Sequence, residues 1–271
     1  MKKTKKSILA FGKILDTVKY RLKFAHFPYL AQAVVKERAR SSSGLLILDV
    51  GCGPGNLAAF CGTPAESTWL GVDLWEHQLH QARDKGLYQH LFQVNLIEGL
   101  PFRDDTLDLV ICNEVLLYLP NSSHLVAEFY RVLRPGGKVF IYNAISWFPR
   151  VMYALKRAIR SIHQEENSIA FDTQTDWKGT RRPCRIKYYS LRSLIDQISS
   201  ARFEVEHVTG FRLFRNRLRF LTYLENFGWY YRLTTFLAGR YPQLAADVMV
   251  VGGKKDLKPE ETRRLKARSA A

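Results

Sequence analysis

The residues with the clearest chemical meaning form a glycine-rich loop directly after an apolar run. Leu45 to Val50 is rich in leucine and β-branched residues, which predicts a buried strand, and the chain continues as Gly51-Cys52-Gly53-Pro54-Gly55. Glycines at such a place let the backbone approach a ligand closely. A pyrophosphate cofactor requires GxGxxG, and Asn56 stands where its third glycine would be, so the GxGxG spacing favours a nucleoside without phosphates.

A carboxylate closes the next predicted strand. That strand runs from Trp69 to Val72 and ends in Asp73. In an open parallel sheet the ligand lies outside the carboxyl ends of the strands, where a carboxylate can accept two hydrogen bonds from a ribose diol. The loop and Asp73 together predict a nucleoside-binding site.

The elements that must position this site alternate along the chain. Further strands are expected at His90–Val94, Leu107–Cys112, Lys138–Tyr142, Phe203–Val208 and Asp247–Val251. A helix capped by Ser122 or Ser123 should stop at Arg134-Pro135-Gly136-Gly137, and Ser190 should cap another. Because strand and helix alternate, the sheet should be parallel.

Composition limits the class of protein. Of 271 residues, 46% are apolar and 24% charged, which excludes a disordered, collagenous or disulfide-stapled chain. No stretch approaches the roughly 18 uncharged apolar residues that cross a bilayer, and no secretory signal is recognisable. Cys52, Cys61, Cys112 and Cys184 form no CxxC pair, which predicts reduced thiols, no metal site and a cytoplasmic protein.

The net charge of +16 is unevenly distributed. Residues 1–43 carry 11 basic against 2 acidic side chains, residues 44–145 carry 6 against 11, and residues 146–271 carry 24 against 12. A protein that binds polyanions would most simply be basic throughout. The split therefore predicts an acidic small-molecule core under a basic cover.

Five ordered segments carry a resemblance to a known family. They are LDVGCGPG (48–55), GVD (71–73), EGLPFRDDTLDLV (98–110), EVLLYLP (114–120) and RVLRPGGKVFI (131–141). In this order they resemble the class I S-adenosylmethionine-dependent methyltransferases, within the group related to the methyltransferase type 11 domain. FEVEHVTG (203–210) and DVMVVGGKK (247–255) resemble the last two strands of that family.

The resemblance implies a fold and a domain plan. The fold is α/β, a Rossmann-like seven-stranded, mostly parallel sheet with an antiparallel last strand, plus helical N-terminal and lid insertions. Residues 1–43 would form a basic helical extension and residues 44–255 the methyltransferase domain. Lid insertions are expected at about 146–189 and 210–244, and residues 256–271 should form a flexible tail.

The resemblance also implies S-adenosylmethionine as cofactor and a set of contacts. Its methionine portion would be held by Asp49 and by the backbone of Gly51, Gly53 and Gly55. Its adenosine would meet Asp73 at the ribose and Leu74, Asn95 and Leu96 at the adenine. Asn113 and Glu114 would lie near its reactive end. Members of the family often carry Asp at the position of Asn95, whose amide oxygen can accept the same hydrogen bond without charge.

No catalytic base is assigned. Methyl transfer from a sulfonium is an in-line displacement in which proximity and exclusion of water supply most of the acceleration. Candidates for a base are His26, His77, His80, Tyr118 and His124. The D/N-P-P-Y/F motif of nucleic-acid amino methyltransferases is absent after the fourth strand, and the thiols are interpreted as structural.

The basic cover leaves three interpretations open. Amphipathic helices are expected at residues 8–22 and 148–162, and residues 210–241 combine ten aromatic side chains with six arginines. The cover could simply pack on the sheet, contact anionic lipid, or contact nucleic acid. The prediction is methyl transfer to a small-molecule or lipid-linked acceptor by a cytoplasmic enzyme, with peripheral contact to an anionic membrane as one of the open interpretations. The alternatives are an RNA methyltransferase and a non-catalytic binding protein.

Overall fold

The computed structural model describes residues 26–41, 44–62, 67–145, 168–175, 181–213, 224 and 227–255 of the chain. Within these ranges no helix is long and apolar enough to cross a membrane. The helices expected at residues 8–22 and 148–162 and the tail at 256–271 lie outside the described residues. The domain boundaries given above stay predictions.

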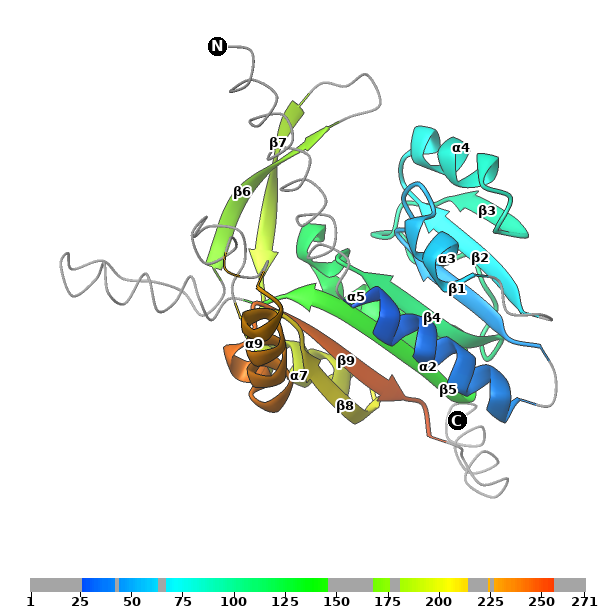
Figure 1. Ribbon diagram of the computed structural model, residues 1–271. Helices are drawn as coiled ribbons and strands as arrows, with labels where there is room; N and C mark the ends of the chain where they lie inside the picture. The colour runs from blue at the N-terminus through cyan, green and yellow to red at the C-terminus, as the bar shows by residue number, and fades with distance from the viewer. Residues whose placement is uncertain are drawn as a thin grey trace, which may run out of the picture.

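The centre of the protein is one seven-stranded sheet in the order β3-β2-β1-β4-β5-β9-β8 (Figure 1). Its strands are β1 (Leu46–Val50), β2 (Thr68–Asp73), β3 (His90–Gln93), β4 (Leu107–Asn113), β5 (Leu133–Ala144), β8 (Glu204–Gly210) and β9 (Asp247–Gly253). The first five pair in parallel, and β9 runs antiparallel to both β5 and β8. The predicted Rossmann-like sheet with an antiparallel last strand is therefore confirmed.

Helices cover both faces of the sheet and bury two apolar layers. The helices are α2 (Phe27–Arg40), α3 (Asn56–Cys61), α4 (Glu76–Asp84), α5 (Ser122–Val132), α7 (Leu191–Ser200) and α9 (Gly228–Arg240), with short 3-10 turns η1 (Leu116–Tyr118) and η2 (Pro242–Leu244). The layer under α2 and α3 includes Leu30 and Trp69. The layer under α5 and α7 includes Phe129 and Ile198. Strands β1, β2 and β4 are buried because helices cover them on both sides, whereas the edge strand β3 is mostly exposed.

The caps of two helices test the sequence-based expectations. Ser190 caps α7 as predicted, since its hydroxyl accepts a hydrogen bond from the Ser193 amide at 3.0 Å. The predicted serine cap of α5 is wrong by one residue. Asn121 is the cap, and its side chain accepts from the Ser123 amide. Ser122 instead forms a buried hydrogen bond with the Tyr189 hydroxyl at 2.6 Å, which holds α5 against the end of β7.

A two-stranded hairpin stands in the segment expected to form a lid. It consists of β6 (Ser168–Thr175) and β7 (Arg181–Tyr188), paired antiparallel along their full length. In Figure 1 the hairpin projects from the end of the sheet at which β4 and β5 finish. An isolated bridge between Ile145 and Tyr189 joins its base to the end of β5. The hairpin was not predicted from the sequence.

Candidate functional site

The glycine loop between β1 and α3 has a left-handed backbone. Gly51, Gly53 and Gly55 have φ angles of 66°, 54° and 74°, which L residues with side chains adopt only at a cost. The amides of Gly51 and Cys52 both donate to the Val72 carbonyl, at 2.8 and 3.0 Å. The loop is therefore fastened to the end of β2, as the strand–loop–helix prediction requires.

The three glycines differ in what surrounds them. A Cβ at Gly51 would collide with a methyl group of Val115, and one at Gly55 would lie 2.9 Å from the Tyr88 ring. A Cβ at Gly53 would meet only the Gln78 side-chain oxygen, at 3.9 Å. Close protein packing thus explains glycine at the first and third positions. Gly53 is the position where the backbone faces open space that a ligand can fill.

Asp73 lies at the end of β2, as predicted, and it also orders the loop. One carboxylate oxygen accepts from the Gly53 amide and the other from the Trp75 amide, both at 2.9 Å. Asp73 is buried. Sequence reasoning gave this carboxylate a ligand-binding role and missed that it fixes the backbone of Gly53.

Asp49 is buried at the end of β1 and receives a hydrogen bond from the Tyr88 hydroxyl at 2.7 Å. Burial, together with the negative charge of Asp73, raises the pKa of Asp49 from 3.8 to about 7, and the Tyr88 hydrogen bond partly opposes this. Burial also raises the pKa of Tyr88 far above its usual value, so this hydroxyl stays a donor. Tyr88 lies in the loop between α4 and β3, where no periodic pattern could have marked it.

The two buried carboxylates at the site suit a cationic ligand. Asp49 and Asp73 are bonded to a phenol and to backbone amides, and within the described ranges neither forms an ion pair with a basic side chain. Two buried carboxylates without a counter-charge are costly, and a cation beside them lowers that cost. S-adenosylmethionine carries both an ammonium and a sulfonium. The residues present therefore fit the cofactor that the resemblance implies.

Two of the residues expected at the adenine differ in exposure, and a third is engaged in its own loop. Leu74 follows β2 and is 47% exposed, whereas Leu96 is buried. The Asn95 amide nitrogen donates to Glu98 at 2.7 Å, and its oxygen accepts from the Ile97 amide at 3.3 Å. One lone pair of that oxygen is left for a further donor.

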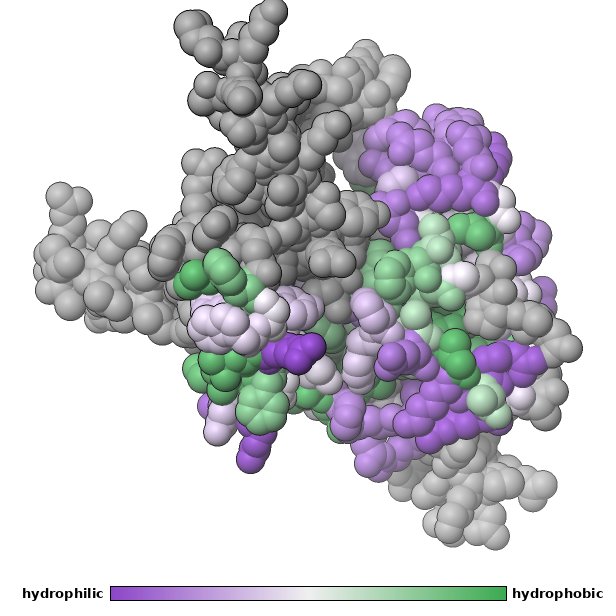
Figure 2. Space-filling view, in the orientation of Figure 1, coloured by the Kyte–Doolittle hydropathy of each residue, from purple (hydrophilic) through white to green (hydrophobic). Residues whose placement is uncertain are grey.

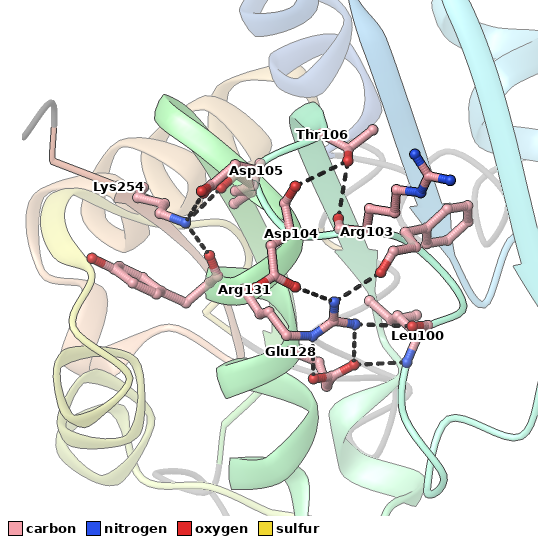
Figure 3. A network of polar contacts seen from close by, with 11 residues as sticks. Leu100, Arg103, Asp104, Asp105, Thr106, Glu128, Arg131 and Lys254 are labelled. Carbon is pink, nitrogen blue, oxygen red and sulfur yellow. Dashed lines mark hydrogen bonds and ion pairs between the residues drawn. The ribbon is translucent and has the colours of Figure 1, made fainter. Parts of the chain in front are cut away.

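A polar network holds the loop that follows Asn95 (Figure 3). The Arg131 guanidinium on α5 donates to the carbonyls of Leu100 and Phe102 and to both oxygens of Glu128. Glu128 in turn accepts from the Leu100 amide at 2.9 Å, and Arg131 lowers the pKa of Glu128. These contacts anchor the segment EGLPFRDDT, although sequence reasoning assigned Arg131 no role.

Asn113 ends β4, and its side-chain oxygen lies 2.7 Å from Nε2 of His26. Glu114 has a φ of 57°, and its amide donates to the Tyr142 carbonyl. Val115 then contacts Gly51, because a Cβ at that glycine would collide with the Val115 side chain. The segment after β4 therefore touches the glycine loop on one side and His26 on the other.

The five candidate bases lie in different surroundings. His80 and His124 are exposed, and His80 pairs with Glu76 on the outer side of α4. Tyr118 is 39% exposed. His77 on α4 is partly buried, and its Nδ1 has no hydrogen-bond partner among the described residues. Of the five, His26 is buried and bonded to a predicted site residue. In the described parts of the chain no group of acidic, cysteine and histidine side chains could hold a metal ion.

Known proteins match this part of the chain. Residues 48–141 match the family described as a methyltransferase domain. GfsG, a methyltransferase of Streptomyces halstedii, is 34% identical over 114 residues, which make up 40% of this chain and 41% of that protein. The ubiquinone biosynthesis O-methyltransferase of Pseudomonas putida is 32% identical over 145 residues, 48% of this chain and 60% of that protein. The chain spans less than two thirds of the length of these relatives.

A solved structure extends the likeness to the fold. The S-adenosylmethionine-dependent methyltransferase of Methanosarcina mazei superposes with a TM-score of 0.55 at 17% identity, over 80% of this chain and 96% of that one. The strand order and the glycine loop define the class I methyltransferase fold. Residues 48–141 thus match a methyltransferase domain within a sheet that has the fold of S-adenosylmethionine-dependent methyltransferases, and S-adenosylmethionine is the cofactor of that class.

Proposed function

We propose that this protein transfers a methyl group from S-adenosylmethionine to a small-molecule acceptor. The observation that carries the proposal is the pair of buried carboxylates, Asp49 and Asp73, beside a glycine loop that faces open space at Gly53. A cationic nucleoside supplies the positive charge that this pair lacks, and it needs the close backbone approach that Gly53 permits.

The proposed cofactor contacts are Asp49, the backbone of Gly51, Gly53 and Gly55, Asp73, Leu74, Asn95, Leu96 and Asn113. Two of these side chains, Asp73 and Asn95, have acceptor capacity beyond the bonds they already make. Each oxygen of Asp73 accepts one backbone amide, and the Asn95 oxygen also accepts one. Further hydrogen bonds from a ribose diol and an adenine amine are therefore compatible with the bonds in the protein.

S-adenosylmethionine, when bound, supplies an electrophilic methyl group on a sulfonium. The residues of this chain have to bind the cofactor, orient the acceptor in line with that methyl and exclude water. Asp49 and Asp73 stabilise the positive charge in the ground state, so the acceleration must come from orientation rather than from these carboxylates. Orientation requires rigid elements, and the segment after β4 is held by Tyr142 and by contact with Gly51.

The acceptor class is proposed from the relatives and from the charge pattern. The ubiquinone biosynthesis enzyme of Pseudomonas putida acts, by its name, on a small molecule. In this chain, residues 44–145 hold the proposed site and carry more acidic than basic side chains. An acidic site repels a polyanion such as RNA. A small or lipid-linked molecule is therefore favoured, and the RNA alternative becomes an outcome of the test.

The test combines binding and turnover. Calorimetry with S-adenosylhomocysteine should show binding to a single site. Trideuteromethyl-labelled S-adenosylmethionine, supplied with small-molecule, lipid and RNA extracts, should place its label in the small-molecule or lipid extract. Absence of binding by a folded protein contradicts the cofactor site. Label in RNA alone contradicts the acceptor class, and binding without any label favours the non-catalytic alternative.

We also propose that the enzyme meets its acceptor at an anionic membrane surface. The supporting feature is a ridge on α9 made of Trp229, Leu233 and Phe236, which are 68%, 46% and 67% exposed. Their spacing puts them on one face of the helix, opposite the buried Thr234 and Ala238. Figure 2 shows apolar side chains on this side of the molecule, beside α9.

The charge around the ridge fits an anionic lipid surface. Arg232 and Arg240 are exposed on the same side of α9, and the helix contains no acidic residue. Aromatic and basic side chains on one helix face are typical of interfacial helices, and each arginine near an anionic bilayer adds about 1 kcal/mol. The cytoplasmic location drawn from cysteine usage stays a prediction.

Flotation with vesicles tests the membrane contact. The protein should float with phosphatidylglycerol vesicles and not with phosphatidylcholine vesicles, and salt should release it. Arg232→Gln should weaken binding about fivefold, and Trp229→Ser should weaken it further. Val35→Ser, which removes an exposed apolar side chain on α2, is the matched control. Equal flotation of the Trp229 variant and the control, or a concentration-dependent dimer lost in the Trp229 variant, would overturn the proposal.

A further inference from the structure

His26 is a buried histidine at the start of α2, beside the ends of two central strands. It is 1% exposed and directly precedes the helix. Its ring stacks on Tyr142 of β5 with a centroid distance of 3.5 Å and bonds to Asn113 at the end of β4. His26 thus lies at the carboxyl edge of the sheet, where ligands of parallel sheets bind.

The hydrogen bond to Asn113 fixes where the imidazole proton lies. The Asn113 side-chain oxygen can only accept, so Nε2 of His26 must be the donor. Burial, with a smaller contribution from Arg212, lowers the pKa of His26 to about 3, although the Asn113 hydrogen bond and the charge of Asp247 oppose this, so the ring is neutral at physiological pH. In the neutral ring Nδ1 then carries a lone pair and no proton.

Within the described part of the chain, that lone pair has no partner. Nδ1 of His26 is buried, and no described residue donates a hydrogen bond to it. The ring cannot easily turn to find one, because it lies flat on Tyr142 and meets the edges of Phe27 and Phe211. A buried acceptor without a donor costs free energy, and such groups in native proteins require an explanation. A ligand that supplies the donor would provide one.

The position of His26 relates it to the reactive end of the cofactor site. Asn113 is followed by Glu114 and by Val115, whose side chain fills the space that a Cβ at Gly51 would need. His26 is thus one hydrogen bond away from the segment that touches the glycine loop. Because Asn113 is one of the proposed cofactor contacts, His26 is linked directly to the proposed cofactor site.

We infer that Nδ1 of His26 accepts a hydrogen bond from an O–H or N–H group of the methyl acceptor and so orients that heteroatom for methylation. This inference rests on the proposed methyl transfer and names its substrate class, a protic oxygen or nitrogen nucleophile. A neutral lone pair recognises a donor and offers nothing to a carbonyl or to an already methylated ether. Because Nδ1 is shielded, binding must also displace side chains that cover it.

Two variants separate this role from a structural one. His26→Gln can keep a donor toward Asn113 and lose the acceptor at the Nδ1 position. His26→Asn has a shorter side chain whose oxygen can stand near the Nδ1 position while the bond to Asn113 is lost. An acceptor-binding role predicts that the Asn variant is the more active of the two. A purely structural role predicts the reverse order.

The assay uses the labelled product that the trideuteromethyl experiment identifies, with initial rates measured over a dilution series of that acceptor fraction. We expect His26→Gln to raise KM about tenfold and His26→Asn to keep KM within about threefold of the wild type. The S-adenosylhomocysteine affinity should stay unchanged in His26→Gln, which keeps the bond to Asn113. The product should carry its label on oxygen or nitrogen. Label on carbon, the reverse order of the variants or an equal KM in both overturns the inference while methyl transfer stands. No label in any extract overturns the proposed function, and the inference falls with it.

Discussion

Gly53 offers the sharpest test of where the cofactor binds, because Gly86 matches it in backbone conformation but not in location. The φ angles are 54° and 64°, and a Cβ at Gly86 would meet nothing within 4 Å. Gly86 lies in the turn between α4 and β3. The variants Gly53→Ala and Gly86→Ala therefore introduce the same left-handed strain at two places, of which Gly53 faces the space proposed for the cofactor.

The magnitudes follow from the geometry. A left-handed alanine costs about 1–2 kcal/mol, which for a domain of this size lowers the melting temperature by about 2–8 °C in either variant. At Gly53 the added methyl group also enters the space proposed for the cofactor. If the ligand shifts and loses one or two hydrogen bonds of about 1–1.5 kcal/mol each, its affinity falls roughly 10- to 100-fold.

Calorimetric titration with S-adenosylhomocysteine, alongside thermal unfolding, measures both effects. Gly53→Ala should lose affinity and melting temperature together, whereas Gly86→Ala should lose melting temperature alone. Wild-type affinity in a folded Gly53→Ala protein would refute the approach of the backbone to the cofactor. An equal loss of affinity in both variants would show that strain, and not the location of the methyl group, controls binding.

Three further predictions concern the groups around the loop. Asp73→Ala should weaken S-adenosylhomocysteine binding on the order of 100-fold, because it removes the ribose contact and also the bond that orders Gly53, and calorimetry measures this. Because the pKa of Asp49 rises on folding from 3.8 to about 7, the free energy of unfolding should fall by about 2–3 kcal/mol between pH 5 and pH 7. Urea titrations at the two pH values measure this fall, which should be absent in Asp49→Asn. Arg131→Met should lower the melting temperature and release the segment near Leu100, which amide hydrogen exchange would detect as faster exchange at that residue.

Much of the sheet could be predicted because its signals are local. Short apolar runs followed by glycine or aspartate mark β1 and β2, and the predicted starts of these strands lie within one residue of the observed ones. The predicted start of β5 is wrong. Lys138 was expected, but the strand begins at Leu133 and includes the Pro-Gly-Gly segment. Turn residues indicated a break there, whereas pairing with β4 continues through an irregular register.

The remaining parts of the site depend on contacts between distant residues. Tyr88 reaches Asp49 across 39 positions, and His26 reaches Asn113 across 87. No pattern within a helix or a strand encodes such a pair, since each partner is determined only by the assembled sheet. The hairpin β6–β7 was missed for a related reason, because its strands were read as part of a lid whose cover was expected to be helical.

The two edges of the sheet differ in how their polar groups are satisfied. At the amino edge the Lys254 ammonium donates to Asp105 and to the carbonyls of Tyr130 and Leu133, so all three of its hydrogens are used (Figure 3). At the carboxyl edge, among the described residues, Asp49 has no counter-charge and Nδ1 of His26 has no donor. These incomplete groups lie beside the proposed site, which is the expected cost of a site built for a ligand. Cofactor and acceptor complete these groups, so each should raise the melting temperature, the first through Asp49 and the second through His26.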